Sequence, residues 1–443
     1  MNTILSRRQV ISGAALAAAA GAAQGFGSPA SALAEVTLNS DPAAGSKNAL
    51  IVIFLRGGAD GLNVIPPHGD DDYYRLRPSI AIRRPSDKSV APTARALDLD
   101  GYFGLHPALA PLLPFYHGGS LLPIHAVGSG DQTRSHFEAM ATVERGLYRD
   151  AGPASGWLAR FLLADPEVNE SPLRAVAVSD TMPDSLRGAS GATALEDLSA
   201  YRLRNLAPTG ASGIRHHSDD LGMERALAKL YATGTTVEGA TGVMLRASGR
   251  ETIAALDAVR RLDPETYRPR AGVEYPQNDV GNALRQVACL VKGRVGLEVA
   301  CLNMEGWDTH VAQGSDTGWQ AGRLSHLALA CAAFAQDLGS RMSGVTLVTM
   351  TEFGRRAYEN SGLGTDHGRA SFMFLLSGAV KGGRVVADWP GLAAHQLEGP
   401  GDLHVTTDYR DVLAEILVSR QHCTDISQVF PAFAPRRLDL IDA

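Results

Sequence analysis

Six short runs of apolar and β-branched residues constrain the fold of this chain more than any other feature of its sequence. Short, continuously apolar runs are typical of strands that are buried on both faces of a sheet. Segment 323–342, between two of these runs, and segment 408–420, after the last of them, have the composition of helices that cover a sheet. The pattern predicts an α/β fold with a mostly parallel central sheet and helices on both faces. The expected strands are Ala49–Leu55, Leu121–Val127, Arg174–Ser179, Gly296–Met304, Gly344–Met350 and Ser371–Leu376.

The amino terminus has the composition of an export signal. It carries the pair Arg7 and Arg8, then an alanine-rich apolar stretch and the small-residue motif "ALA" ending at Ala34. This order predicts a twin-arginine signal peptide over residues 1–34, and a periplasmic or secreted protein. Residues 35–443 are then expected to form a single domain. The polar, alanine-rich segment at about 190–277 is expected to be a helical insertion or cap on that domain.

Composition excludes several partners. The net charge is −6, and no run of Lys or Arg outside the signal forms a basic stripe, so nucleic acid is not expected as a partner. No second apolar run approaches the length of a membrane span. The four cysteines fit neither a zinc ribbon nor a CxxC motif, so we expect buried thiols, with one disulfide possible after export. The oligomeric state is left open.

Residues with the chemistry of a metal site follow several of the expected strands. Ligands bind at the carboxyl ends of the strands in an open parallel sheet, so these residues are expected to meet in one crevice. Carboxylates and neutral imidazoles are ligands for divalent metals in hydrolytic sites. We therefore expect one or two divalent ions, zinc first, with manganese, magnesium or calcium as alternatives. The residues are Asp60, Ser135, Asp308, His310, Glu352, Asp366 and His367.

Two local spacings support this expectation. Asp308 and His310 are two residues apart, so in extended backbone their side chains point to the same side. Asp366 and His367 are adjacent, and a regular strand would point them apart. Their loop, "GLGTDHGRA", has glycines on both flanks, which allow a turn that directs both side chains inward. The alternative is that this loop is only a turn.

An ordered set of motifs gives the chain a resemblance. "LIVIFLRGGADG", a serine at a helix start, "GWDTH" and "GTDHG" together resemble an exported bacterial family of unassigned function within the alkaline phosphatase and sulfatase superfamily. The resemblance runs from about Leu50 to Asp442. It implies an alkaline-phosphatase-like fold and a hydrolase of phosphate or sulfate esters whose substrate is a small molecule or a polymer.

The resemblance also implies a division of ligands between two ions. One ion would be held with the oxygen of Ser135 as a nucleophile, and the other by the D-x-H motif. A remaining late histidine would be His404 or, less preferred, His395. The first ion would have Asp60, Asp366 and His367, and the second Asp308 and His310. One metal, or none, remains an alternative.

Ser135 has two interpretations. Glu138 follows it by three residues, as in a capping box, so the serine could serve only as a helix cap. A helix amino terminus also favours an anion, and metal coordination would make the hydroxyl a nucleophile. Neighbouring His136 is a candidate acid or substrate contact.

Other polar residues have supporting roles in this hypothesis. Arg134, Arg355 and Arg369 are candidates to bind the oxygens of a tetrahedral anion. Glu352 could bind metal or, as we prefer, hydrogen-bond a histidine ligand. His125 lies inside an apolar run and is expected to be buried with a hydrogen bond.

Two functions of different class remain. The first is an exported, metal-dependent hydrolase of phosphate or sulfate esters with a serine nucleophile. The alternative is a non-catalytic secreted binding or structural protein that keeps the same fold. A formylglycine sulfatase signature, a GxSxG elbow, a P-loop and a GxGxxG turn are all absent from the sequence.

Overall fold

A computed structural model describes most of the chain after the amino terminus. The described residues are 48–148, 152–164, 169–201, 222, 226–229, 231 and 239–442, and the predicted signal peptide lies outside them. The chain divides into two compact units, one of which comprises Gly45–Ala200 and Leu262–Ala443. The other includes the segment Tyr201–Arg261, whose main described element is the helix α8 (Gly239–Leu262).

The first unit is built on an eight-stranded sheet with the order β10-β4-β9-β8-β1-β7-β5-β6. All six expected strands are present, most of them within a residue or two of the expected ends. The mostly parallel sheet is therefore confirmed. Its strands are β1 (Ala49–Leu55), β4 (Leu121–Gly128), β5 (Ala175–Val178), β6 (Ala192–Leu195), β7 (Val299–Met304), β8 (Val345–Met350), β9 (Ser371–Ser377) and β10 (Thr407–Asp408). A separate hairpin pairs β2 (Leu97–Asp98) with β3 (Gly104–Leu105).

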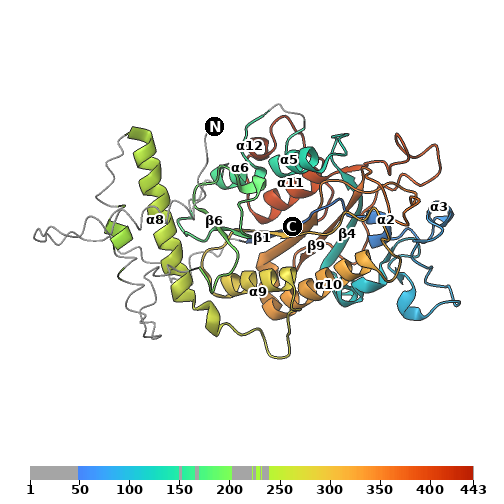
Figure 1. Cartoon of the computed structure of the whole chain (residues 1–443), viewed down its shortest axis with the longest axis horizontal. Helices are drawn as coiled ribbons and strands as arrows, with labels where there is room; N and C mark the ends of the chain where they lie inside the picture. Colours follow the sequence, from blue (N-terminus) through green and yellow to red (C-terminus); the bar gives the residue numbers. More distant parts are fainter. Residues whose placement is uncertain are drawn as a thin grey trace, which may run out of the picture. The chain divides into compact units, whose positions relative to one another are not determined.

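Helices cover both faces of this sheet, as the apolar runs predicted. Figure 1 shows α5, α6, α11 and α12 on one side and α9 and α10 on the other. The central strands β1, β8 and β9 are buried along their whole length, which is why they read as continuous apolar runs. The helices are α2 (Gly61–Val64), α3 (Asp71–Leu76), α4 (Leu113–His117), α5 (His136–Arg145), α6 (Trp157–Ala164), α9 (Asp279–Lys292), α10 (Trp319–Leu338), α11 (Tyr409–Arg420) and α12 (Ile426–Val429).

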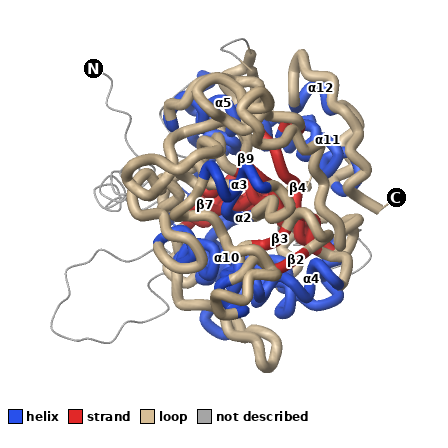
Figure 2. The backbone as a smooth tube through the Cα atoms, turned by 90° about the vertical axis from the view of Figure 1, so that its right-hand side faces the viewer, coloured by secondary structure: helices blue, strands red, loops and turns tan. Residues whose placement is uncertain are grey.

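Strand β9 runs against the rest of the sheet. It pairs antiparallel with both of its neighbours, β4 and β8, whereas the other neighbouring strands pair in parallel. Because β8 ends at the carboxyl edge and β9 begins there, the loop between them stays at that edge. In an all-parallel sheet, the residues just before a strand would lie at the opposite edge. The direction of β9 therefore places Asp366 and His367 with the ends of the other strands, at the edge that carries α2 and α3 in Figure 2.

Several further expectations can be compared with the fold. The expected insertion at 190–277 overlaps β6, which belongs to the main sheet, so the helical segment begins later, after that strand. All four cysteines are buried as thiols. His125 is fully buried and its Nε2 lies 3.1 Å from the carbonyl oxygen of Ile65, which confirms its expected environment. Within the described residues, no helix is long and apolar enough to cross a membrane.

Candidate metal centre

Three histidines and one aspartate from three loops meet at the carboxyl edge of the sheet. His136 begins α5 after β4, Asp308 and His310 follow β7, and His367 precedes β9. We call His136, Asp308, His310 and His367 the histidine cluster. Nitrogens of His136 and His367 and a carboxylate oxygen of Asp308 all lie within 4.8 Å of one another. His310 joins them, because its Nε2 lies 2.8 Å from Nε2 of His367.

Each histidine of the cluster has its Nδ1 held by an acceptor. His367 Nδ1 lies 2.8 Å from the carbonyl oxygen of Arg134, and His136 Nδ1 lies 2.8 Å from Oε1 of Glu352. His310 Nδ1 lies 3.3 Å from Oδ1 of Asp366. A carbonyl or carboxylate oxygen can only accept, so we assign the proton of each neutral ring to Nδ1. Each Nε2 then carries a lone pair.

These lone pairs face Asp308. Its Oδ1 lies 3.2 Å from Nε2 of both His310 and His367, and its Oδ2 lies 3.5 Å from Nε2 of His136. Nε2 of His136 is buried and has no hydrogen-bond partner among the described residues. Two lone pairs 2.8 Å apart on His310 and His367 repel unless a proton or a cation lies between them.

The donor set fits a divalent metal. Zinc takes nitrogen and carboxylate ligands at about 2.0–2.2 Å in a tetrahedron, which places donor atoms about 3.3 Å apart. Asp308 Oδ1 lies 3.2 Å from Nε2 of His310 and of His367, close to that value, whereas these two nitrogens are closer together, at 2.8 Å. Histidine ligands whose other nitrogen binds a carboxylate or carbonyl are the usual arrangement in metal sites. The cluster could therefore hold one ion.

The surroundings shift the pKa values of two histidines of the cluster in opposite directions. The hydrogen bond with Glu352 raises the pKa of His136 above its ordinary value. Burial lowers the pKa of His367, because desolvation disfavours the imidazolium. His367 is therefore the more readily available as a neutral ligand, whereas a metal at His136 competes with a proton.

The two nearest carboxylates are held in the ionised form. Burial by itself raises the pKa of Asp308, but the hydrogen bond and charge of Arg355 outweigh it and the net pKa is lowered. Burial likewise opposes ionisation of Glu352, and hydrogen bonds from His136, from the Gly57 N–H and from Thr351 bring its pKa below the ordinary value. Glu352 thus hydrogen-bonds a histidine of the cluster, as expected for the second of its two roles.

Asp366 acts on the cluster through His310. Asn360 Nδ2 donates to Asp366 Oδ1 at 2.9 Å, and this hydrogen bond is the main reason why the pKa of Asp366 is lowered. Asn360 Nδ2 also donates to the carbonyl oxygen of His310 at 3.0 Å. Sequence reasoning missed Asn360, because no local spacing relates it to residues on another loop. The only local indication in the sequence was that Asn360 begins a run of turn-forming residues, 360–364.

Glycines next to the Asp366–His367 pair are required by close packing. A Cβ on Gly364 would lie 2.4 Å from the backbone of His310, and one on Gly368 would lie 2.4 Å from the backbone of Arg355. These approaches bring the loop against two other segments of the site. The glycines therefore serve close contact more than the free bending that the sequence suggested.

Asp60 has a different environment from the one expected. Arg77 Nη1 donates to its Oδ2 at 2.6 Å and Arg77 Nη2 to its Oδ1 at 2.8 Å, and both side chains are buried. Gln313 Nε2 also donates to Oδ2 at 2.6 Å. Asp60 is paired with a guanidinium and is not joined with Asp366 and His367. We therefore omit Asp60 from the proposed ligands.

Ser135 occupies the cap position of α5 without making the cap. The helix begins at His136, but no side-chain hydrogen bond joins Ser135 to the helix. Glu138 instead accepts a hydrogen bond from Thr133 Oγ1 at 2.8 Å. The interpretation of Ser135 as the cap of a capping box, one of the two considered, is therefore wrong. Ser135 lies between two residues that contact the cluster, since the carbonyl of Arg134 binds His367 and His136 belongs to the cluster itself.

The three arginines are already engaged by the protein. Arg355 is buried and donates to the carbonyl oxygens of Gly57, Gly58, Trp307 and Thr365 as well as to Asp308. It organises loops, and its burial keeps it from contacting an anion at the surface. Arg134 pairs with Asp402, and Arg369 with Glu398. Arg134 keeps about a third of its side chain exposed, so it is the best placed to contact an anion.

The expected late histidine does not join the cluster. His404 Nδ1 contacts a carboxylate oxygen of Glu398, and the side chain is about half exposed. His395 is exposed in its loop. The fourth donor of the cluster is instead His136, which the sequence had suggested only as an acid or a substrate contact.

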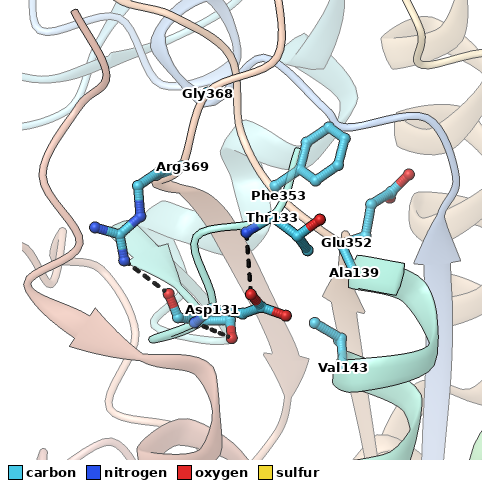
Figure 3. A pocket seen from close by; sticks show the side chains of 9 residues that line it. Asp131, Thr133, Ala139, Val143, Glu352, Phe353, Gly368 and Arg369 are labelled. Atoms are coloured by element: carbon cyan, nitrogen blue, oxygen red, sulfur yellow. Dashed lines mark hydrogen bonds between the residues drawn. The ribbon is translucent and has the colours of Figure 1, made fainter. Parts of the chain in front are cut away.

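A small pocket adjoins the cluster. It is lined by residues of the loop after β4, by α5 and by the loop between β8 and β9, including Asp131, Thr133, Phe353 and Arg369 (Figure 3). Glu352 lines it as well, and the ring of Phe353 lies 4.9 Å from that of His136 and 4.8 Å from that of His367. The pocket gives polar and apolar contacts beside the possible metal position.

Comparison with known proteins found one sequence family that matches most of the chain. The model of a family described as "Protein of unknown function (DUF1501)" matches residues 47–436. No curated protein was found to be similar to the chain.

Proposed function

The chain belongs to the DUF1501 family of proteins of unknown function, and from its site we propose that it is an exported, metal-dependent hydrolase of phosphate or sulfate esters with Ser135 as the nucleophile. One observation carries the proposal. Three imidazoles present Nε2 around Asp308 while their Nδ1 atoms are held by fixed acceptors. A cluster built for structure alone would pair these nitrogens with donors.

The proposed ligands are His136, Asp308, His310 and His367, which differ from the two separate ligand sets implied by the sequence. A divalent ion bound there would act as a Lewis acid and lower the pKa of a nearby hydroxyl. Zinc suits the nitrogen-rich donor set best. Manganese, magnesium and calcium suit sites richer in oxygen.

The residues around the ion have separate roles in the proposal. Ser135 would attack phosphorus or sulfur, the bond to the ester oxygen would break, and the resulting serine ester would be hydrolysed by water. The proton of Ser135 would pass to solvent water and the leaving alkoxide would take one from it, since the site is open to solvent at Asp308, which keeps 48 % of its side chain exposed. Arg134 would contact the anionic oxygens. Glu352 and Asp366 would orient His136 and His310.

Fold and location are part of the same proposal. The mostly parallel sheet with ligands at its carboxyl edge agrees with an alkaline-phosphatase-like architecture, which the motif resemblance implies. The twin-arginine signal would bring the folded, metal-loaded protein to the periplasm or outside the cell.

A non-catalytic metal-binding protein is the second candidate. It is favoured by one observation, the pairing of Arg369 and Arg134 with Glu398 and Asp402, which leaves few free cations for a substrate. Such a protein would keep its metal and have no turnover to lose.

Metal content and turnover of matched variants test the two candidates. We expect wild-type protein purified without chelator to carry one zinc ion by elemental mass spectrometry and to hydrolyse phosphate or sulfate esters. Ser135→Ala should keep the metal and lose turnover, whereas Asp308→Asn combined with His367→Ala should lose both. His117→Ala, exposed on α4 at the opposite edge of the sheet, should change neither.

The outcomes separate the candidates. Metal in the wild type without turnover on phosphomonoesters, phosphodiesters and sulfates would support the non-catalytic protein. A folded protein that binds no divalent metal, even when metal is supplied, would refute the hydrolase.

A further inference from the structure

Large apolar side chains are exposed immediately beside the histidine cluster. Val311 follows His310 and is 72 % exposed, and Leu363 lies three residues before Asp366 and is 52 % exposed. Phe137, which follows His136 in α5, is 89 % exposed. Scattered exposed apolar residues are normal on a protein surface, but their gathering next to polar site residues is not.

Backbone hydrogen bonds bring Val311 and Leu363 together. Ala312 N–H donates to the carbonyl oxygen of Gly362 at 2.9 Å, and Gln313 N–H donates to that of Leu363 at 3.0 Å. A Cβ placed on Gly362 would lie 3.5 Å from Cγ2 of Val311, so the valine side chain lies against the chain just before Leu363. Val311 and Leu363 therefore lie on adjacent segments beside the cluster, and we call these two residues the apolar rim.

Both segments of the apolar rim contain a residue with an unfavourable backbone conformation. Leu363 has a φ of 57° and Ala312 a φ of 49°, in the left-handed region that glycine or asparagine adopts more readily. An exposed leucine at such a position gains nothing from burial and is disfavoured by its backbone. Strained residues that persist near a site are often used by that site.

We propose that the apolar rim binds the alkyl or aryl group of an ester substrate, so that the enzyme prefers esters of apolar alcohols. This inference rests on the proposed function. It divides the substrate between two regions: the anionic group at the metal and Arg134, and the uncharged alcohol part at Val311 and Leu363. A sugar or another polyol would leave the rim exposed and gain nothing from it.

Alkyl phosphates test the inference, because their alcohols leave with similar ease. We expect zinc-loaded wild type to show kcat/KM at least about tenfold higher for n-hexyl phosphate than for ethyl phosphate, from burial of the additional methylenes. Leu363→Asn suits the left-handed backbone, and Val311→Thr keeps the side-chain shape. Each should reduce that preference about threefold or more by lowering kcat/KM for n-hexyl phosphate. Leu329→Gln, at an exposed apolar position on α10, is the control and should keep the preference.

Binding of n-hexylphosphonate and ethylphosphonate to zinc-loaded Ser135→Ala, measured by calorimetry, separates the inference from catalysis. If neither phosphate is cleaved but hexylphosphonate binds more tightly and loses this advantage in the rim variants, the rim is supported and the hydrolase is refuted. The proposal is refuted if kcat/KM or affinity is the same for the hexyl and the ethyl compound, or if neither phosphonate binds. It is also refuted if both rim variants keep the preference for the hexyl compound. A wild-type dimer that Leu363→Asn dissociates in sedimentation would also overturn it, because the rim would then be a contact between copies.

Discussion

Two aspartates at the same sheet edge have opposite surroundings. Asp60 is 1 % exposed, and both of its carboxylate oxygens accept hydrogen bonds from the buried guanidinium of Arg77. Asp308 keeps 48 % of its side chain exposed and, apart from Arg355, faces three imidazole nitrogens. Both follow a strand of the parallel sheet and both looked like metal ligands in the sequence.

The difference teaches how to separate a structural carboxylate from a ligand. At Asp60 a fixed cation already balances the charge, so a metal ion would add a second positive charge to a closed site. Asp308 also pairs with the buried Arg355, but three histidines beside it offer lone pairs that a bound cation would satisfy. Four predictions test this contrast, in order of decreasing effect.

The largest effect is expected at the closed site. Arg77→Met should reduce the free energy of unfolding by about 3–5 kcal/mol, because it leaves the buried Asp60 unpaired. Urea unfolding measures the loss. Adding Asp60→Asn to the variant should recover part of it, and Arg75→Met, at an exposed position, should change stability by less than about 0.5 kcal/mol. A loss below about 1 kcal/mol for Arg77→Met would mean that the ion pair does not organise this edge.

Removal of metal is expected to have the next largest effect. Zinc at about a thousand times its dissociation constant should add about 4 kcal/mol to the free energy of unfolding, because only the folded chain assembles the ligands. Urea unfolding with zinc and with a chelator measures the difference. The Asp308→Asn, His367→Ala double variant should show no such difference. The free energy of unfolding of Arg77→Met should lie below that of the wild type by the same amount with zinc and with chelator. A wild type indifferent to the chelator contradicts the metal centre.

Loss of a supporting carboxylate should have a smaller effect. Glu352→Gln keeps the side-chain volume but removes the charge that holds the Nδ1 proton of His136, so zinc affinity should fall about tenfold. Competition with a fluorescent zinc chelator measures this change. Glu274→Gln, at an exposed position, provides the control. Unchanged affinity would show that His136 is oriented without Glu352.

The smallest effect is a dependence on pH in the metal-free protein. The folded pKa of His136 is raised by Glu352, so the protonated ring stabilises the fold. This stability is fully present below the ordinary value of 6.5 and is lost as the pH rises through the higher folded pKa. The expected loss is about 1 kcal/mol or less, because the imidazole of His136 is partly exposed.

Unfolding in chelator from about pH 5.5 to 8.5, for wild type and His136→Gln, measures this dependence. Zinc affinity should change in the opposite direction and rise with pH, because the metal must displace the same proton. Parallel stability curves for the two proteins would contradict the assigned partner of His136.

Much of the fold was predictable because strands of a covered parallel sheet are apolar along their length. All six runs became strands, and two of the expected helices appear as α10 and α11. The missed strands β6 and β10 are four and two residues long, and so carry too little pattern to recognise. The D-x-H motif and the Asp366–His367 pair were also recognised, because local spacing brings their residues together.

The remaining site residues could not be identified in this way. Asp60 and Arg77 pair across 17 positions with no periodic signal, and Asn360 reaches His310 across 50. Ser135 and Glu138 have the spacing of a capping box, yet Thr133 binds Glu138 instead. In each case several partners were chemically equivalent in the sequence, and packing selected one of them.

The sequence by itself determined the strands, the covering helices and the residue types at the carboxyl edge, because apolar burial and side-chain chemistry are local properties. Tertiary structure alone decided which residues meet. The antiparallel direction of β9 keeps His367 at the edge where β7 delivers Asp308 and His310, and α5 adds His136. Strand direction depends on hydrogen bonding between distant segments, so no pattern within one segment can specify it.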